Sequence, residues 1–267
     1  AAMPLGGVTR AAYDGYFGAS TETAAQLEKM LDDPSSGVDA PAAIIVETVQ
    51  GEGGLNVASA RWLRAIERIA RKQGALLIID DIQAGCGRTG TFFSFEDAGV
   101  SPDIVTMAKS ISGMGLPMAL VLLKPELDRW APGEHNGTFR GNCHAFVTAR
   151  AAIETFWADS AFEEAVRRKS ALLNARLADM AETHSVALGV KGRGMMQGLD
   201  VGDGDVSARI VRAAFELGLI IETSGPNDEI VKVLAPLTIS EAEFTRGLGL
   251  LDRAVGRAMR VKSEYAA

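Results

Sequence analysis

Two short apolar runs, each closed by an acidic residue, most constrain how this chain can fold. Residues 42–47 read AAIIVE and residues 75–80 read ALLIID. Continuous apolar runs of this length are typical of strands that a parallel sheet buries on both faces. Between them, residues 58–72 repeat apolar side chains at helical spacing, and Gly74 follows as a stop signal. Strand, crossover helix and strand in this order predict a βαβ unit, and therefore an α/β fold.

The order of the predicted helices and strands changes near residue 158. Before that point we expect a loop, a helix and two shorter strands, at residues 1–18, 21–31, 104–107 and 118–123. After it, helices and strands follow without a βαβ rhythm, at residues 162–182, 186–190, 195–201, 206–217, 219–223, 230–234 and 241–260. We therefore predict a partial large domain over residues 1–157 and a smaller α+β domain over residues 158–267.

Composition and charge exclude several classes of protein. Of the 267 residues, 47% are apolar and 23% are charged, which is ordinary for a globular chain and unlike a disordered or collagen-like one. The net charge is −7 and basic residues do not cluster, so we expect no nucleic-acid partner. The apolar runs are far shorter than the ~20 residues of a membrane helix, so we expect no membrane partner. Two cysteines, Cys86 and Cys143, cannot build a disulfide framework, which favours the cytoplasm.

An acid and a lysine follow two of the predicted strands. Asp80 comes directly after five apolar residues, so its charge lies at the edge of a dry layer and requires a cationic partner. Lys109 follows the run at 104–107 among small residues, and partial burial would lower its pKa and free the neutral amine as a nucleophile. Such a pair meets the needs of pyridoxal phosphate (PLP), because the acid keeps the ring nitrogen protonated and the lysine holds the aldehyde. The alternatives are a helix-capping carboxylate and a solvated surface lysine.

The second apolar run has a competing interpretation. Its sequence LLIIDD is also typical of the strand that ends in a magnesium-binding aspartate in P-loop NTPases. That interpretation requires a G-x-x-x-x-G-K-[ST] loop to hold the phosphates, and this sequence contains none. A nucleotide-binding function is therefore disfavoured.

Four motifs carry a resemblance to a known family. They are ETVQGEGG at 47–54, DDIQAGCGRTG at 80–90, AKS at 108–110 and GTFRGN at 137–142. In this order they resemble the successive signatures of class III PLP-dependent aminotransferases. The resemblance implies the fold-type-I architecture, a mostly parallel sheet sandwiched by helices, with a smaller C-terminal α+β domain.

Finer segments point to one branch of that family. LNVASARWLR, FFSFEDAG and PGEHNGTFRGN are similar to its diaminobutyrate-forming members, which serve ectoine biosynthesis. This implies transfer of an amino group from L-glutamate to L-aspartate 4-semialdehyde, which gives 2-oxoglutarate and L-2,4-diaminobutyrate. The alternatives are another class III aminotransferase or an aminomutase, acting on an ω-amino acid or in a siderophore pathway, and a catalytically silent homologue that acts as a binding partner.

The resemblance also implies roles for the residues that hold the cofactor. Asp80 would pair with the pyridinium nitrogen, and Gln83 would approach the phenolic oxygen of the ring. Lys109 would hold the aldehyde and then carry the proton between substrate and cofactor. Thr138 would bind the cofactor phosphate of the neighbouring subunit, which implies a homodimer with shared active sites.

The substrate-binding residues are less directly implied. Glu52 matches an acid that, in related enzymes, screens a carboxylate-binding arginine. Lys232 stands where many relatives have that arginine, and Arg140 is the rival candidate for the carboxylate. The usual Asp-Glu pair is here Asp80-Asp81. The family's N-terminal phosphate loop and ring-stacking aromatic have no counterpart in this sequence, so we expect the N-terminal part of the family fold to be missing from it.

Overall fold

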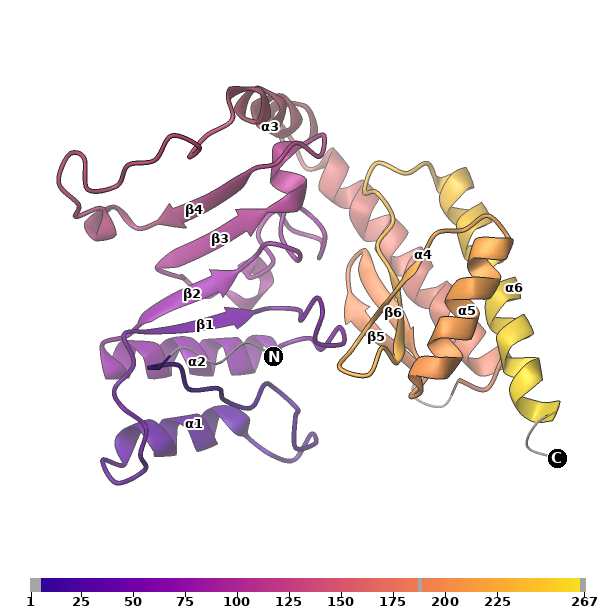
Figure 1. The fold of residues 1–267 in the computed structure, drawn as a ribbon, viewed down its shortest axis with the longest axis horizontal. Helices are drawn as coiled ribbons and strands as arrows, with labels where there is room; N and C mark the ends of the chain where they lie inside the picture. Colours follow the sequence, from indigo (N-terminus) through magenta and orange to yellow (C-terminus); the bar gives the residue numbers. More distant parts are fainter. Residues whose placement is uncertain (1–5, 187–188, 265–267) are drawn as a thin grey trace.

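The two apolar runs form adjacent parallel strands, as predicted. In the computed structural model, which describes residues 6–186 and 189–264 and side chains up to residue 259, they are β1 (Ala43–Glu47) and β2 (Leu76–Asp80). The third strand, β3 (Ile104–Ala108), pairs in parallel with β2, and β4 (Ala119–Leu123) adds an antiparallel edge. The sheet order is β1-β2-β3-β4 (Figure 1). The predicted α/β arrangement is therefore confirmed.

The crossover helix α2 (Ala60–Gln73) covers one face of this sheet. Ser59 caps its start by accepting a hydrogen bond from the Trp62 N–H at 3.2 Å, and Gly74 closes its end with a left-handed φ of 66°. The apolar side of the helix packs on Leu77 and Ile79. Helix α1 (Thr23–Asp32) packs on α2 in turn.

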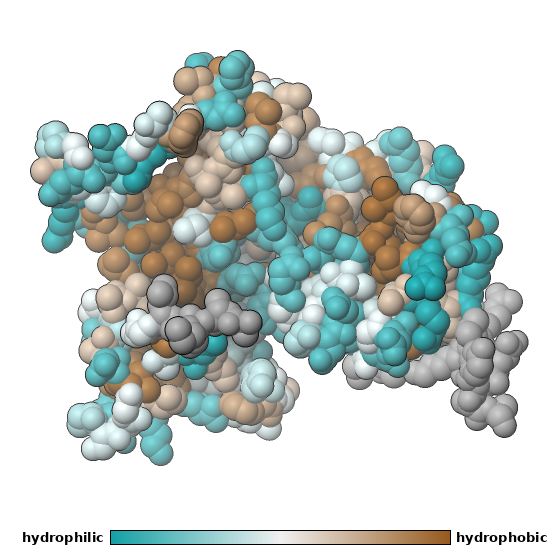
Figure 2. All heavy atoms as spheres, in the orientation of Figure 1, coloured by the Kyte–Doolittle hydropathy of each residue, from teal (hydrophilic) through white to brown (hydrophobic). Residues whose placement is uncertain are grey.

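The opposite face of the sheet is largely exposed in the described part of the chain. Ile45 is 62% exposed and Val121 is 59% exposed. Figure 2 shows hydrophobic side chains gathered over these strands. The expectation that the first strand is buried on both faces is therefore wrong for these residues. A parallel sheet needs helices on both faces, and within the described chain α2 supplies that cover on one face only.

A helix that the sequence did not predict, α3 (Cys143–Phe156), follows β4 and the short helix η3 (Pro125–Leu127). The Asn142 side chain caps it by accepting from the His144 N–H at 3.1 Å. The helix packs on η2 (Lys109–Ser112), the turn that follows β3. Its apolar residues point in several directions and many are exposed, which is why no amphipathic pattern revealed it.

The second half contains an antiparallel sheet packed against three helices. The strands are β5 (Gly189–Arg193), β6 (Met196–Asp200), β7 (Glu222–Ser224) and β8 (Ile230–Val233), in the order β5-β6-β8-β7. The helices are α4 (Ala161–Thr183), α5 (Gly204–Glu216) and α6 (Glu241–Glu264). Between residues 6 and 264, apart from 187–188, none of the helices is both long and apolar enough to cross a membrane.

Two of the predicted strands differ from the observed ones. The strand expected at 186–190 includes residues 187–188, which lie outside the described residues, and its described part belongs to β5, Gly189–Arg193. The strand expected at 219–223 starts at residue 222, because Leu219 and Ile221 pack against the core of this half without joining the ladder. The division into domains at residues 157 and 158 stays a prediction.

Hydrogen bonds from two arginines connect the halves, which lie side by side in Figure 1. Arg88 donates to the carbonyl of Ala235 at 2.6 Å and to that of Met195 at 3.2 Å. From the other side, Arg193 donates to the Ser94 carbonyl at 2.6 Å. The carboxyl ends of β1, β2 and β3 face the second half across this junction (Figure 1).

A buried polar network secures the chain just after β2. Asp81 is 1% exposed and accepts hydrogen bonds from the hydroxyl and the N–H of Ser94. Thr48 in turn bonds to the Ser94 hydroxyl, which ties the ends of β1 and β2 together. Burial raises the pKa of Asp81 to about 6, although the Ser94 hydrogen bonds oppose that shift.

We expect Asp81→Asn to remove a pH-dependent loss of stability. The folded protein holds the Asp81 proton more tightly than the unfolded chain does. The protonated carboxyl therefore favours folding below its ordinary pKa of about 4, and that contribution is lost as the pH rises through about 6. A shift of about two pKa units corresponds to roughly 3 kcal/mol. Urea unfolding of the full-length natural protein should show the parent losing up to that much, relative to Asp81→Asn, between about pH 4 and about pH 7.

The exposed Asp39, in the turn before β1, supplies the matched control. Asp39→Asn makes the same chemical change without a buried partner, so its stability should follow that of the parent at both pH values. A difference between Asp81→Asn and the parent that does not change with pH would contradict the assignment.

Candidate functional site

The register of the parallel strands brings three polar side chains to one place on the exposed face. Glu47, Asp80 and Thr106 are successive ladder partners across β1, β2 and β3, so they project from the same face at the same height. Asp80 also accepts a hydrogen bond from the Ile82 N–H at 3.1 Å, where the chain turns after β2. Asp81 is buried against Ser94 instead. Of the two adjacent acids, Asp80 is therefore the one presented on this face.

Glu47 is held beside Asp80 by the loop that follows β1. Its carboxylate accepts a hydrogen bond from the Gly51 N–H at 2.8 Å. Burial raises the pKa of Glu47 above its ordinary range despite that bond, and the adjacent charges of Asp80 and Glu52 add to the rise. The exposed face therefore gathers negative charge at the carboxyl ends of β1 and β2.

Lys109 lies directly after β3, at the same end of the sheet. Its backbone adopts a left-handed φ of 54°, which is costly for a residue with a side chain and is often found at functional sites. The residue is exposed in the described part of the chain. The expectation that the Lys109 amine is partly desolvated is therefore wrong within the described chain, because the described residues leave this side chain exposed at the end of β3.

A chain of hydrogen bonds runs from Gln83 into the second half of the molecule. Gln83 donates from Nε2 to Glu52 Oε1 at 3.0 Å. The same oxygen is 3.2 Å from the Nζ of Lys232, which lies on β8. The Lys232 ammonium also lies 3.1 Å from Glu222 Oε1, and the Lys232 side chain is only 1% exposed. Hydrogen bonding by Gln83 and the charge of Lys232 lower the pKa of Glu52.

The loop that carries Glu52 is fixed by the second sheet. The Ser224 hydroxyl donates to the Gly51 carbonyl at 2.9 Å, and the Gly225 N–H donates to the Glu52 carbonyl at 3.1 Å. A Cβ at Gly51 would lie 2.6 Å from Gln83 Oε1, so a side chain there would displace the Gln83 amide. Residues more than 170 positions apart are thereby held in one site.

Two polar side-chain atoms at this site have no hydrogen-bond partner within the described chain. Among the residues that the structure describes, Gln83 Oε1 and Thr106 Oγ1 are buried without a hydrogen-bond partner. Thr106 is the ladder neighbour of Asp80, and Gln83 follows Asp80 by three residues. The donor set that PLP requires is also present, with a carboxylate for the ring nitrogen at Asp80 and a primary amine for the aldehyde at Lys109. The residues present therefore fit PLP.

Two other predicted residues lie in a different environment. Thr138 and Arg140 belong to a segment, residues 128–144, that is exposed throughout. Arg140 contacts the ring of His135 at 2.7 Å. Lys232, by contrast, meets Glu52. Of the two candidates for a substrate carboxylate, the structure thus brings Lys232 to the other site residues.

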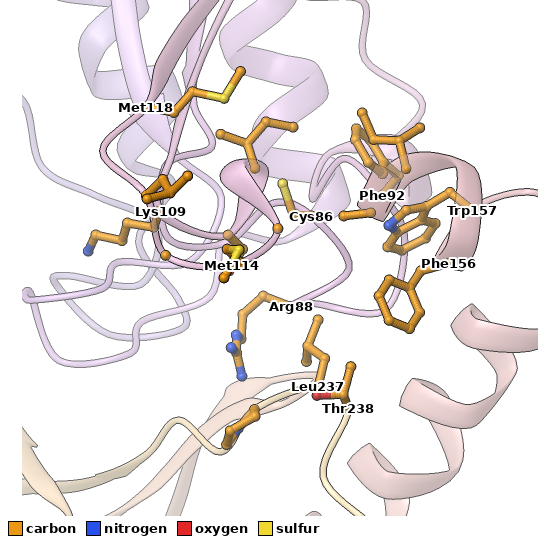
Figure 3. Close-up of a pocket in the computed structure, with 18 of the residues that line it drawn as sticks. Cys86, Arg88, Phe92, Lys109, Met114, Met118, Phe156, Trp157, Leu237 and Thr238 are labelled. Atoms are coloured by element: carbon orange, nitrogen blue, oxygen red, sulfur yellow. The ribbon is translucent and has the colours of Figure 1, made fainter. Parts of the chain in front are cut away.

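A cavity of about 760 Å³ lies between the two halves, next to Lys109. Phe92, Trp157 and Phe162 form its aromatic wall. In Figure 3 the Lys109 side chain extends away from Phe92, Trp157 and Cys86. The amine of Lys109 therefore points away from the aromatic side of this cavity.

Sequence reasoning missed two residues of this arrangement, Thr106 and Glu222. Thr106 could have been found from the sequence, because it is the one polar residue in the predicted strand at 104–107. Glu222 could not, because its contact with Lys232 depends on the cross-strand register of β7 and β8.

Comparison with known proteins identifies the family of this chain. The family model "Aminotransferase class-III" matches residues 4–255. A diaminobutyrate–2-oxoglutarate transaminase of Bordetella parapertussis is 54% identical over 261 residues, which cover 97% of this chain and 60% of the relative. The transaminase of the same name in Vibrio cholerae is 55% identical over 254 residues, which cover 95% of this chain and 61% of the relative. The chain thus spans about 60% of the length of these curated relatives.

Solved structures agree with the fold. An aminotransferase of Bacillus anthracis superposes with a TM-score of 0.80 at 29% identity, covering 89% of this chain and 56% of that one. The N-acetylornithine aminotransferase of Stenotrophomonas maltophilia gives a TM-score of 0.76 at 31% identity, covering 90% of this chain and 62% of that one. The predicted fold class is confirmed. The match over residues 4–255 and the identity above 50% show that the chain belongs to the class III aminotransferase family.

Proposed function

We propose that the protein is a diaminobutyrate–2-oxoglutarate transaminase. It moves an amino group from L-glutamate to L-aspartate 4-semialdehyde, which gives 2-oxoglutarate and L-2,4-diaminobutyrate, the first step of ectoine biosynthesis. The observation that carries this proposal is the convergence of Asp80, Gln83, Glu52 and Lys232 at the sheet edge that also bears Lys109. Relatives of that name match nearly the whole chain.

Class III aminotransferases depend on PLP, which when bound supplies an aromatic electron sink for the electrons of a substrate C–H bond. Asp80 would hold a proton on the ring nitrogen, and Gln83 would orient the ring through its side-chain amide. Lys109 would hold the aldehyde through Nζ. The Lys109 amine would also be the base that moves the proton at the substrate carbon.

Lys232 and Glu52 serve the two substrates in turn. Glutamate has a second carboxylate, which requires a cation, and we assign that task to Lys232 rather than to Arg140. When the four-carbon substrate reacts, Glu52 covers the ammonium of Lys232. Glu52 is ionised at neutral pH, as an ordinary carboxyl group is, and Gln83 and Lys232 lower its pKa further.

We further infer a homodimer in the cytoplasm. Thr138 lies in an exposed segment next to Phe139, which is 98% exposed, and a second subunit would cover both. There Thr138 would bind the cofactor phosphate of the neighbouring subunit. Both cysteines are free thiols, which suits a reducing compartment.

The function is tested first by an absorbance spectrum of the full-length natural protein with PLP. We expect a yellow band that disappears when L-glutamate is added, with release of 2-oxoglutarate. L-aspartate 4-semialdehyde should then restore the band and yield L-2,4-diaminobutyrate. No spectral change on addition of PLP would indicate a catalytically silent homologue.

Replacement of Lys109 by alanine should abolish the yellow band of covalently held pyridoxal and lower turnover by about 10³-fold or more. The reason is that both the bond to the aldehyde and the proton transfer depend on the same amine. Spectra and stopped assays on the full-length protein measure the two effects. Lys29→Ala, at an exposed position of α1, is the matched control and should behave like the parent. Turnover that survives in Lys109→Ala would remove this lysine from the mechanism.

Asp80→Asn should lower turnover by about 10²–10³-fold and weaken PLP binding, because the uncharged amide no longer holds the proton on the ring nitrogen. Single-turnover spectra with glutamate measure the rate, and equilibrium dialysis measures the affinity for PLP. Asp97→Asn, at an exposed acid of the same half, controls for the loss of one charge. Activity of Asp80→Asn within a few-fold of the parent would contradict the assignment.

Mixing two inactive variants tests the shared active site. If Lys109 and Thr138 serve the same site from different subunits, dimers formed from Lys109→Ala and Thr138→Ala subunits contain one intact site. Random reassociation then restores about a quarter of the parental activity, since half of the dimers are mixed and each has one working site of two. Either variant alone should stay inactive. No recovery on mixing would place both residues in the site of one subunit.

A further inference from the structure

The buried ammonium of Lys232 has two carboxylate partners. Glu222 Oε1 lies 3.1 Å from Nζ and Glu52 Oε1 lies 3.2 Å from it. The Gly51 carbonyl is a third partner at 3.5 Å. A lysine ammonium has three N–H donors, so all of them are used. A substrate carboxylate must therefore displace one of these partners before Lys232 can bind it.

The two acids differ in how firmly they are placed. Glu222 is the direct cross-strand neighbour of Lys232 in the antiparallel pair of β7 and β8, and the next pair, Thr223 and Val231, continues the ladder. Glu52 projects from the turn after β1, and its side chain is 78% exposed, against 59% for Glu222. Glu52 is therefore the partner that can leave, and Glu222 is the one that stays.

This difference sets the charge that a substrate meets. With both acids in place, the group of Glu52, Glu222 and Lys232 carries a net charge of −1. When Glu52 moves aside, the remaining pair is neutral. Without Glu222 the same two states would carry 0 and +1. Glu222 thus makes each state more negative by one unit, which opposes the binding of a carboxylate.

We propose that Glu222 is a specificity-determining residue of this active site. It limits how tightly Lys232 holds the carboxylate of glutamate and of 2-oxoglutarate, so that this product can leave and the four-carbon substrate can compete for the site. The inference rests on the proposed function for the identity of the substrates. The electrostatic effect of Glu222 on Lys232 does not depend on which carboxylate Lys232 binds.

The test uses Glu222→Gln in the full-length natural protein loaded with PLP. Glutarate, an unreactive dicarboxylate, is titrated by calorimetry. We expect Glu222→Gln to bind glutarate about fivefold more tightly than the parent, which is the scale of one partly exposed charge pair. In turnover, the KM for glutamate and for 2-oxoglutarate should fall by a similar factor, while the KM for L-2,4-diaminobutyrate changes less than twofold.

Two further variants separate this role from a structural one. Glu222→Asp keeps the charge and should bind glutarate as the parent does. Glu216→Gln, at an exposed acid at the end of α5, makes the same charge change away from Lys232 and should have no effect. If Glu222 merely holds Lys232 in position, Glu222→Gln will bind glutarate as weakly as the parent or more weakly, and that result overturns the proposal.

Failure of the inference and failure of the proposed function give different results. A parent protein that reacts with glutamate, combined with unchanged glutarate affinity in Glu222→Gln, leaves the function standing and removes the role of Glu222. A parent that does not react with glutamate removes the proposed function. The calorimetric comparison still decides the electrostatic role in that case, because it does not depend on turnover.

Discussion

The site depends on the parallel register of three short strands. Pairing of Glu47 with Asp80 and of Asp80 with Thr106 places polar side chains in one row at the carboxyl ends of β1, β2 and β3, and the chain enters Lys109 immediately beyond. A shift of one residue in any strand would turn its polar side chain to the face covered by α2 and destroy the row. The apolar residues beneath maintain that register through burial of Leu77 and Ile79.

The second half of the molecule completes the site with charge. Lys232 is buried in the second sheet, and its ammonium is neutralised by one acid from each half, Glu52 and Glu222. An unpaired ammonium at that depth would be costly, so the pairing also helps to hold the halves together. The contacts of Arg88 and Arg193 across the same junction are made to carbonyl groups. One interface therefore joins the halves and also holds the cation that we propose binds the substrate carboxylate.

The face of the first sheet that carries Asp80 is left uncovered by the described residues. Lys109 is exposed and Ile45 is largely exposed, whereas Gln83 Oε1 and Thr106 Oγ1 are buried without partners among the described residues. The row of side chains is thus arranged by this chain, but the described residues do not provide dry surroundings for the Lys109 side chain. The bound cofactor and a second subunit are the groups that we propose to supply them.

Local patterns determined much of the fold. Apolar runs and helical spacing predicted β1, β2 and α2, including the stop at Gly74, because periodicity and capping act over a few neighbouring residues. The motifs also singled out Asp80, Gln83, Glu52 and Lys109. Tertiary structure decided the rest. The approach of Lys232 to Glu52 across 180 residues and the second acid at Glu222 depend on sheet register and on the packing of the two halves, which no local pattern encodes.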